Sequence, residues 1–331
     1  MSTLDRRQVF IATGAWLVAC RAAQAQPAGR VYRLGYLAAG SKTGLPPRFL
    51  ANLRELGYVE GQNLLVERRY AEGQVDRLPA LAAELVRTNP DILVAGGTDP
   101  TRALMKVTGT VPIVFTASAN PVGYGLVAHL ARPGGNVTGA SRADGEGLAT
   151  KMLQLLKQAA PRLTQVSVLH TYDAGEMGAQ LNRLQAAAGT LKLQVDAHQA
   201  ETTIEFDRAL ATIGSAAGPG GTRGLVVTGS PYFDAKRDRL VQFAADKRLP
   251  AIYYAAGWVD NGGLMSYGPN TSELGRHVAS YIDRILKGAK PGDLPVVLPT
   301  QFDLVINLKT AGTLGLHIPG TLQVSAARVV E

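Results

Sequence analysis

The stretch that decides the fold is residues 91–115, DILVAGGTDPTRALMKVTGTVPIVF. It opens with an apolar run from Asp91 to Ala95, passes through a loop rich in glycine and hydroxyl residues, and continues as a helical segment from Pro100 to Thr108. A second apolar run follows at Pro112 to Phe115. Two apolar strands joined by a helical connection of a dozen or more residues pair in parallel, through a right-handed crossover. This stretch therefore predicts a β-α-β unit.

The same alternation of short strands and longer helices extends outward in both directions. In the first half the expected strands are 31–37, 64–70, 91–95 and 112–115, and the expected helices are 46–56, 75–88, 100–108 and 122–130. The break at residues 132–136 (RPGGN) precedes a short extended piece at 137–141. The second half then offers helices at 147–159, 178–191, 204–216 and 234–247 and strands at 165–170, 193–197, 224–228 and 250–254. A helix at 273–287 and a strand at 301–308 complete the pattern.

Two similar halves followed by returning segments predict an α/β protein of two doubly wound parallel-sheet lobes joined by multiple crossings. The expected organisation is a signal segment at 1–25, an N-terminal lobe of 26–142 plus 267–292, and a C-terminal lobe of 143–266 plus 293–331. A ligand of such a fold binds beyond the carboxyl ends of the strands, where loops lead into helices.

The first 25 residues are typical of a secretory signal. Arg6 and Arg7 precede an apolar run from Val9 to Cys20, and the small-residue site Ala23-Gln24-Ala25 follows it. The run is too short to span a bilayer as a mature helix. We therefore expect a periplasmic protein that begins at Gln26.

Two alternatives remain open within the signal. The paired arginines also suit the twin-arginine export route. Residues 17–20 (LVAC) resemble a lipobox, in which Cys20 would carry the lipid and become the first residue of a membrane-anchored protein. Cys20 is the only cysteine of the chain, so its removal with the signal would leave no thiol and no disulfide.

Charge argues against a nucleic-acid partner. The formal net charge is +8, but the cations are spread along the chain, and no cluster of them lies beside aromatic residues. A moderate, dispersed positive charge instead favours small anionic ligands or an anionic surface.

Six polar loops follow the expected strands. In the first half they read AAGS (38–41), GGTDPT (96–101) and TASANP (116–121); in the second half they read HTYD (170–173), TGSPYF (228–233) and YYAAGW (253–258). Hydroxyls and free amides at helix N-termini suit a carboxylate, and aromatic rings suit the apolar part of a ligand. The candidate ligand-binding residues are Ser41, Thr98, Thr101, Ser118, Asn120, Tyr172, Tyr232 and Tyr253. Helix capping is an equally good account of any single Ser or Thr among them.

Motifs for cofactors and catalysis are weak or missing. Residues 35–43 (GYLAAGSKT) approach a P-loop, but Ser41 stands where lysine should follow glycine. The glycines at 123 and 125 lie too far past the preceding strand for a dinucleotide fingerprint ending at Asp144. There is no G-x-S-x-G or H-E-x-x-H motif, and the histidines lack metal-ligand spacing. We expect no cofactor, no metal and no enzymatic activity, with His170 bordering the site.

Six sequence blocks together resemble the ABC-transporter substrate-binding proteins of the tryptophan/tyrosine-binding type. They are residues 57–63 (GYVEGQN), 77–82 (RLPALA), 132–139 (RPGGNVTG), 263–268 (GLMSYG), 285–291 (ILKGAKP) and 302–311 (FDLVINLKTA). The resemblance covers essentially all of the chain after the signal. It implies a type I periplasmic binding fold with three crossings, and delivery of a small ligand to a membrane permease and ATPase.

The resemblance also implies a binding site formed by Thr98 and residues 118–120 of one lobe, facing Tyr172 and Tyr232 of the other. One position departs from the family pattern: Asn120 stands where an aspartate is common, and asparagine offers no charge to an α-ammonium group. We therefore expect a ligand that carries a carboxylate or carbonyl group, with or without an α-amino group.

The expected function is that of an exported, monomeric solute-binding protein that hands an amino acid or another small carboxylate to an ABC transporter permease. Two alternatives stay open: a periplasmic sensing subunit that presents the ligand to a membrane receptor, and an enzyme built on the same fold.

Overall fold

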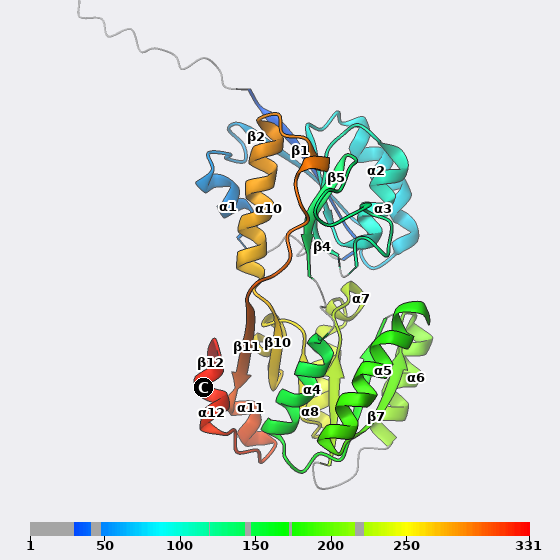
Figure 1. Ribbon diagram of the computed structural model, residues 1–331, viewed down its shortest axis with the longest axis vertical. Helices are drawn as coiled ribbons and strands as arrows, with labels where there is room; N and C mark the ends of the chain where they lie inside the picture. The colour runs from blue at the N-terminus through cyan, green and yellow to red at the C-terminus, as the bar shows by residue number, and fades with distance from the viewer. Residues whose placement is uncertain (1–29, 41–47, 119, 143–146, 172–173, 216–221) are drawn as a thin grey trace, which may run out of the picture.

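The computed structural model describes residues 30–40, 48–118, 120–142, 147–171, 174–215 and 222–331. The chain folds into two α/β lobes, one above the other in Figure 1, and each lobe is built on its own sheet. The α/β fold with doubly wound sheets is thus confirmed.

The sheet of the N-terminal lobe is entirely parallel, in the order β2-β1-β3-β4-β5. Its strands are β1 (Tyr32–Ala38), β2 (Leu64–Tyr70), β3 (Ile92–Gly96), β4 (Ile113–Ser118) and β5 (Val137–Ser141). Its helices are α1 (Phe49–Glu55), η1 (Val75–Arg77), α2 (Leu78–Arg87), α3 (Thr98–Val107), α10 (Thr271–Leu286) and η2 (Pro291–Asp293).

Alternation along the strands explains why helices cover both faces of this sheet. Leu34 and Tyr36 of β1 point into a core with α1 and α10, whereas Leu37 joins the core under α2 and α3. Strands buried on both faces read as continuous apolar runs, which is why the pattern of residues 91–95 predicted β3.

The C-terminal lobe has a sheet in the order β12-β11-β10-β9-β8-β6-β7. Its strands are β6 (Gln165–His170), β7 (Gln194–Gln199), β8 (Arg223–Val227), β9 (Ala251–Tyr253), β10 (Met265–Pro269), β11 (Phe302–Asn307) and β12 (Arg328–Val330). Its helices are α4 (Leu148–Ala159), α5 (Ala174–Leu191), α6 (Thr203–Ser215), α7 (Pro231–Asp234), α8 (Arg237–Asp246), α9 (Gly257–Asp260), α11 (Leu308–Thr313) and α12 (Gly320–Ser325). The β10–β11 pair is antiparallel, which a purely parallel expectation did not include.

The chain passes between the lobes after β5, between β10 and α10, and between Val297 and β11. The expected boundary at residue 267 falls within β10, whose pairing with β9 and β11 makes it part of the C-terminal sheet. The expected boundary at 293 comes before Val297, whose amide donates to Gly139 and whose carbonyl accepts from Ser141 in the N-terminal lobe.

The last two crossings are joined by side chains. Asn270 caps α10 by accepting a hydrogen bond from the Glu273 amide (2.8 Å), and its own amide group donates to Asp303 (2.8 Å). Glu273 in turn accepts from the Thr300 hydroxyl (2.5 Å) and the Gln301 amide (3.3 Å). We call these five residues the crossing clamp, because they link the start of α10 to the segment that enters β11.

Two expected helices differ in the structure. Residues 121–125 form a turn instead of the start of a helix at 122–130, because Gly125 has a φ of +68° and the amides of Leu126 and Val127 both donate to the Pro121 carbonyl. The expected helix at 234–247 begins three residues later, as α8, and the separate short helix α7 precedes it.

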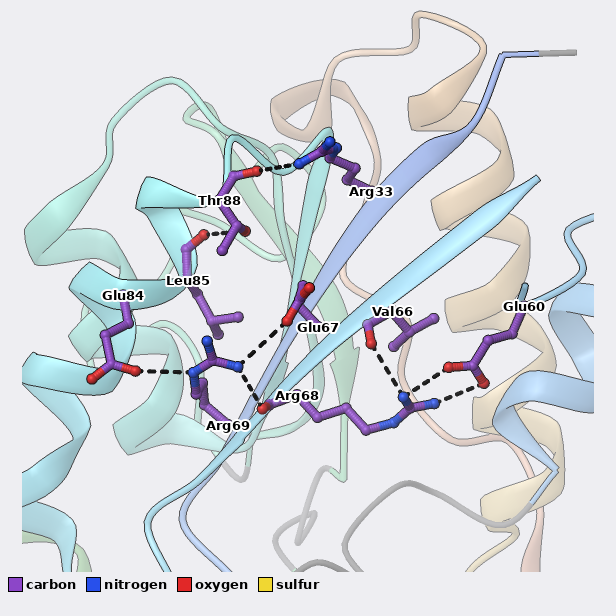
Figure 2. A network of polar contacts seen from close by, with 9 residues as sticks. All are labelled: Arg33, Glu60, Val66, Glu67, Arg68, Arg69, Glu84, Leu85 and Thr88. Carbon is purple, nitrogen blue, oxygen red and sulfur yellow. Dashed lines mark hydrogen bonds and ion pairs between the residues drawn. The ribbon is translucent and has the colours of Figure 1, made fainter. Parts of the chain in front are cut away.

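Charged side chains line β2, the edge strand of the N-terminal sheet (Figure 2). Arg68 pairs with Glu60 (2.8 Å), and Arg69 pairs with Glu84 (3.0 Å) and Glu67 (3.5 Å). These groups are partly exposed, so each pair adds little to stability. Charges on an edge strand oppose pairing with another chain, and this is the role the network fits.

Within the described ranges, no helix is both long enough and apolar enough to cross a bilayer.

Candidate functional site

A chain of hydroxyl groups crosses the carboxyl ends of β3, β4 and β5. The Thr98 and Ser118 hydroxyl oxygens lie 3.0 Å apart. The Ser118 carbonyl accepts hydrogen bonds from the Ser141 hydroxyl (2.8 Å) and the Arg142 amide (2.9 Å). Ser118 and Ser141 are buried, and Thr98 is half-buried. The structure thus brings the predicted residues Thr98 and Ser118 together at the end of the sheet.

Thr101 supports this edge from behind. Gly97 precedes α3 with a φ of +114°, a backbone conformation that favours glycine. The Thr101 hydroxyl donates to the Gly97 carbonyl (2.6 Å), and its side chain is fully buried. Its hydroxyl is therefore engaged in holding the loop, and the structure does not place it at the surface of the edge.

Asn120 is exposed and caps the turn that replaces the expected helix. Its side-chain oxygen accepts from the Gly123 amide (2.9 Å). A Cβ at residue 123 would lie 2.2 Å from the Asn120 amide nitrogen, so any larger residue there would displace the Asn120 side chain from its capping position. Two other predicted residues, Ser41 and Tyr172, lie outside the described residues.

The predicted aromatic residues of the C-terminal lobe are packed within it. Tyr232 contacts Phe206 and Phe233 at ring-centroid distances of 6.0 and 5.9 Å, and Lys236 lies 4.9 Å from its ring centre. Partial burial raises the pKa of Tyr232. Tyr253 is 1% exposed and stacks on Trp258 at 4.8 Å, so its ring belongs to the core.

The next residue, Tyr254, belongs to a polar cluster with Asp234 and Arg237 that was not predicted from the sequence. Its hydroxyl donates to the Asp234 carboxylate, which also accepts from Arg237 (3.1 Å). Burial, and then the charge of Asp234, raise the pKa of Tyr254 well above its ordinary value. The guanidinium of Arg237 lies 5.5 Å from the Trp258 ring. The only sequence signal for this cluster was the pair of adjacent tyrosines after β9.

Arg142 connects the carboxyl ends of the strands in the two lobes. It follows β5 of the N-terminal lobe, yet its guanidinium carbon lies 5.4 Å from the centre of the Tyr254 ring. One of its nitrogens lies 3.5 Å from the Gly229 carbonyl of the C-terminal lobe. Arg142 was not among the predicted residues, because a single arginine after a strand matches no known binding motif.

His170 ends β6 beside His198 of β7. Burial, and secondarily the neighbouring His198, lower the pKa of His170 to about 4. It is therefore neutral at pH 7. Across the described part of the chain, no group of three or more metal-ligating side chains could hold a metal ion.

The carboxyl ends of the strands in the two lobes thus bring together hydroxyls, backbone amides, the Arg142 guanidinium, and the Tyr254 ring beside the Asp234 carboxylate. These groups suit recognition of a small molecule that combines polar groups with an apolar part.

Three comparisons extend these observations. The family model described as ABC transporter substrate binding protein matches residues 48–330. The chain is 26% identical to a tyrosine-binding protein of Clostridioides difficile over 270 residues, which cover 81% of this chain and 76% of that protein.

Solved structures agree. A conserved domain protein from Vibrio cholerae matches with a TM-score of 0.80 at 26% identity, over 91% of this chain and 100% of that chain. An ABC domain in complex with L-Trp from Streptococcus pneumoniae matches with a TM-score of 0.79 at 25% identity and the same coverage.

Proposed function

Because the chain belongs to the family of ABC transporter substrate-binding proteins, we propose that it captures an amino acid or another small carboxylate between its lobes and delivers it to an ABC transporter permease. The lobes close around the ligand through contacts that only the closed form makes, and no chemical step follows. The main support is the meeting of two strand edges at Arg142, because ligands of open α/β sheets bind at such edges.

An aromatic amino acid is the ligand class to test first. The relatives with tyrosine and L-Trp in their names share about a quarter of their residues with this chain. The half-buried Thr98 supplies a hydroxyl for a carboxylate, backed by the buried Ser118 hydroxyl at 3.0 Å, and the buried Tyr254 ring lies under Arg142 at the same junction. Asn120 carries no charge, so the α-amino group contributes less to binding than the carboxylate.

The proposed location is the periplasm, reached through the signal at residues 1–25. Transport then requires the permease as a partner, and we propose that the protein meets it as a monomer.

Isothermal titration of the exported protein tests the proposal. The panel contains L-tyrosine, L-tryptophan, their deaminated acids, and the decarboxylated amines tyramine and tryptamine. We expect the carboxylates to bind and the amines to bind much more weakly. A ligand present at 100-fold excess over its Kd should add about 2.7 kcal/mol to the free energy of unfolding.

Two threonines provide a matched pair for locating the site. Thr98→Val removes a hydroxyl at the strand edge, whereas Thr88→Val removes one that donates to Leu85 at the far end of α2. Weaker binding is expected for Thr98→Val alone. If no compound of the panel binds, or if both variants bind like the unmodified protein, the proposed ligand class or site is wrong.

A further inference from the structure

Arg142 is fixed at its base within the N-terminal lobe. Its amide donates to the Ser118 carbonyl (2.9 Å), and the hydroxyl of the preceding Ser141 donates to the same oxygen (2.8 Å). Ser141 is buried and pairs with Ser118 in the register of β4 and β5. The position from which the Arg142 side chain leaves the lobe is therefore set by the sheet.

The other end of Arg142 lies on the C-terminal lobe. Its guanidinium carbon is 5.4 Å from the Tyr254 ring centre, within the range of a cation–π contact, and one nitrogen is 3.5 Å from the Gly229 carbonyl. One side chain thus connects the end of β5 to the loops that follow β8 and β9.

The C-terminal lobe is shaped to receive this side chain. A Cβ on Gly229 would lie 2.9 Å from an Arg142 nitrogen and 3.1 Å from the Tyr254 ring. Any larger residue at 229 would displace one of the two. The backbone conformation at position 229 does not itself require glycine, because the φ angle of Gly229 is not positive. Space for the guanidinium is therefore the physical reason for glycine here.

Tyr254 is itself held in place by the C-terminal lobe. Its hydroxyl donates to Asp234, and Arg237 holds the same carboxylate (3.1 Å). The ring is 8% exposed, so it cannot turn freely. Contacts within the C-terminal lobe therefore fix the ring on which Arg142 lies.

We infer that Arg142 is a positioning residue that holds the two lobes in their ligand-competent arrangement, with Gly229 and Tyr254 as its seat. A contact made in one arrangement of two lobes and lost in another shifts the population toward the first. Apparent ligand affinity scales with the fraction of molecules in the competent arrangement, so the contact raises affinity without touching the ligand. The effect on affinity rests on the proposed function, whereas the effect on lobe geometry does not.

Spin-label distance measurements on the ligand-free protein test the geometry directly. Lys106→Cys on α3 and Arg208→Cys on α6 place labels at exposed positions of the two lobes, with the native Cys20 replaced by serine. Arg142→Ala and Gly229→Ala should each broaden the distance distribution and move it away from that of the parent. Arg142→Lys, which keeps the charge but not the planar guanidinium, should recover part of the parent distribution.

Arg102→Ala is the matched control. Arg102 lies 5.1 Å from the Tyr124 ring and 3.5 Å from the Tyr124 carbonyl, so it makes the same two contacts as Arg142, but inside the N-terminal lobe. Gly109→Ala serves as the control for glycine, because a Cβ there meets nothing within 4 Å. Neither control should change the inter-lobe distance.

Titration with L-tryptophan and L-tyrosine completes the test. We expect Arg142→Ala and Gly229→Ala to weaken binding about 3- to 30-fold, in line with a cation–π contact of partly desolvated groups, while the controls bind like the parent. Unchanged distances in both variants would overturn the inference, even with weaker binding, because Arg142 would then act on the ligand itself. If the unmodified protein binds neither amino acid, the proposed ligand class fails, and the distances still decide the role of Arg142.

Discussion

At the scale of single residues, adjacent tyrosines at the end of β9 have separate roles. Tyr253 stacks on Trp258 in the core, whereas Tyr254 connects Asp234 to Arg142 at the junction of the lobes. Both rings contact Trp258, Tyr253 stacked at 4.8 Å and Tyr254 edge-on at 6.1 Å, but only Tyr254 also reaches Asp234 and Arg142. Tyr253 was the predicted ligand-binding residue, but the polar contacts are made by its neighbour Tyr254.

Removing only the Tyr254 hydroxyl should separate its two contacts. Tyr254→Phe keeps the ring under Arg142 but leaves the partly buried Asp234 with one donor fewer, so we expect a loss of about 1–2 kcal/mol in the free energy of unfolding. Urea denaturation measures it. Tyr58→Phe is the control, because the Tyr58 hydroxyl donates to Asp283 (3.0 Å) away from the junction. Both variants should lose stability, and only Tyr254→Phe should also alter ligand affinity; equal affinity in the two would remove Tyr254 from the site.

His170 should make stability depend on pH. Its folded pKa of about 4 lies below the ordinary value of 6.5, so the unfolded chain takes up the proton first as pH falls. The free energy of unfolding should therefore be highest above pH 6.5, decrease between pH 6.5 and 4 by up to about 3 kcal/mol, and level off below pH 4. His198, whose pKa is also lowered by burial, acts in the same direction.

Denaturant titrations at pH 7, 5.5 and 4.5 measure this dependence. His170→Gln should show a shallower decrease than the parent, because glutamine cannot take up a proton in this range. His129→Gln changes an exposed histidine and should reproduce the parent slope. Identical slopes in all three proteins would show that His170 does not cause the effect.

The sequence identified the loops that follow the strands but did not indicate which of their side chains face the junction. Thr98 is half-buried at the edge and contacts the buried Ser118, whereas Thr101, three residues on in α3, is buried with its hydroxyl bonded to the Gly97 carbonyl. Whether a hydroxyl is used for capping or left for a ligand depends on the register of neighbouring strands. That register is a long-range property, and a local pattern does not contain it.

At the scale of elements, the crossing clamp links a helix of one lobe to a strand of the other. Asn270 both caps α10 and donates to Asp303 of β11. Asn270→Ala should lower the free energy of unfolding by about 1–2 kcal/mol, through the lost cap and the lost contact with Asp303. It should also increase hydrogen exchange in the first turn of α10.

Asn307→Ala is the matched control for the clamp. Asn307 caps α11 through the Thr310 amide (3.0 Å) and takes no part in the crossings. Its loss should destabilise the protein by a similar amount while leaving exchange in α10 unchanged. Equal protection of α10 in both variants would contradict the role given to the clamp.

The central strands of the first half were the easiest elements to predict. Because they are buried on both faces, nearly all of their residues are apolar, and this gives a continuous apolar run in the sequence. The errors occurred where glycine and proline interrupt a helical pattern. Residues 121–125 form a turn around Gly123 and Gly125, and the short helix α7, which begins at Pro231, was not expected. The short strand β12 escaped notice because three residues show no periodicity.

At the scale of the whole molecule, the resemblance of six sequence blocks predicted the family, and the family model and solved structures confirm it. The number of lobes followed from the repeated strand–helix pattern. The limits of the lobes did not, because they depend on long-range pairing: β10 pairs with β9 and β11, whereas Val297 pairs beside β5 in the other lobe.

Export should remove the first 25 residues. The apolar run and the site Ala23-Gln24-Ala25 predict a mature chain that begins at Gln26. Intact-mass analysis of protein released from the periplasm measures this start. A mass carrying acyl chains on Cys20 would instead show a lipid-anchored protein, and an Arg6→Lys, Arg7→Lys variant that remains in the cytoplasm would indicate the twin-arginine route.

The second crossing, between β10 and α10, also has a consequence for the order in which the chain is completed on the ribosome. All five strands of the N-terminal sheet are complete by Ser141, but α10, which covers one face of that sheet, ends only at Leu286. At about 5–20 residues per second, the apolar face around Leu34 remains without its covering helix for roughly 7 to 29 seconds. The strands β6 to β10 of the second lobe and the helices between them follow one another without such a gap, so the core of the lobe that is made last can begin to assemble before α10 covers the first.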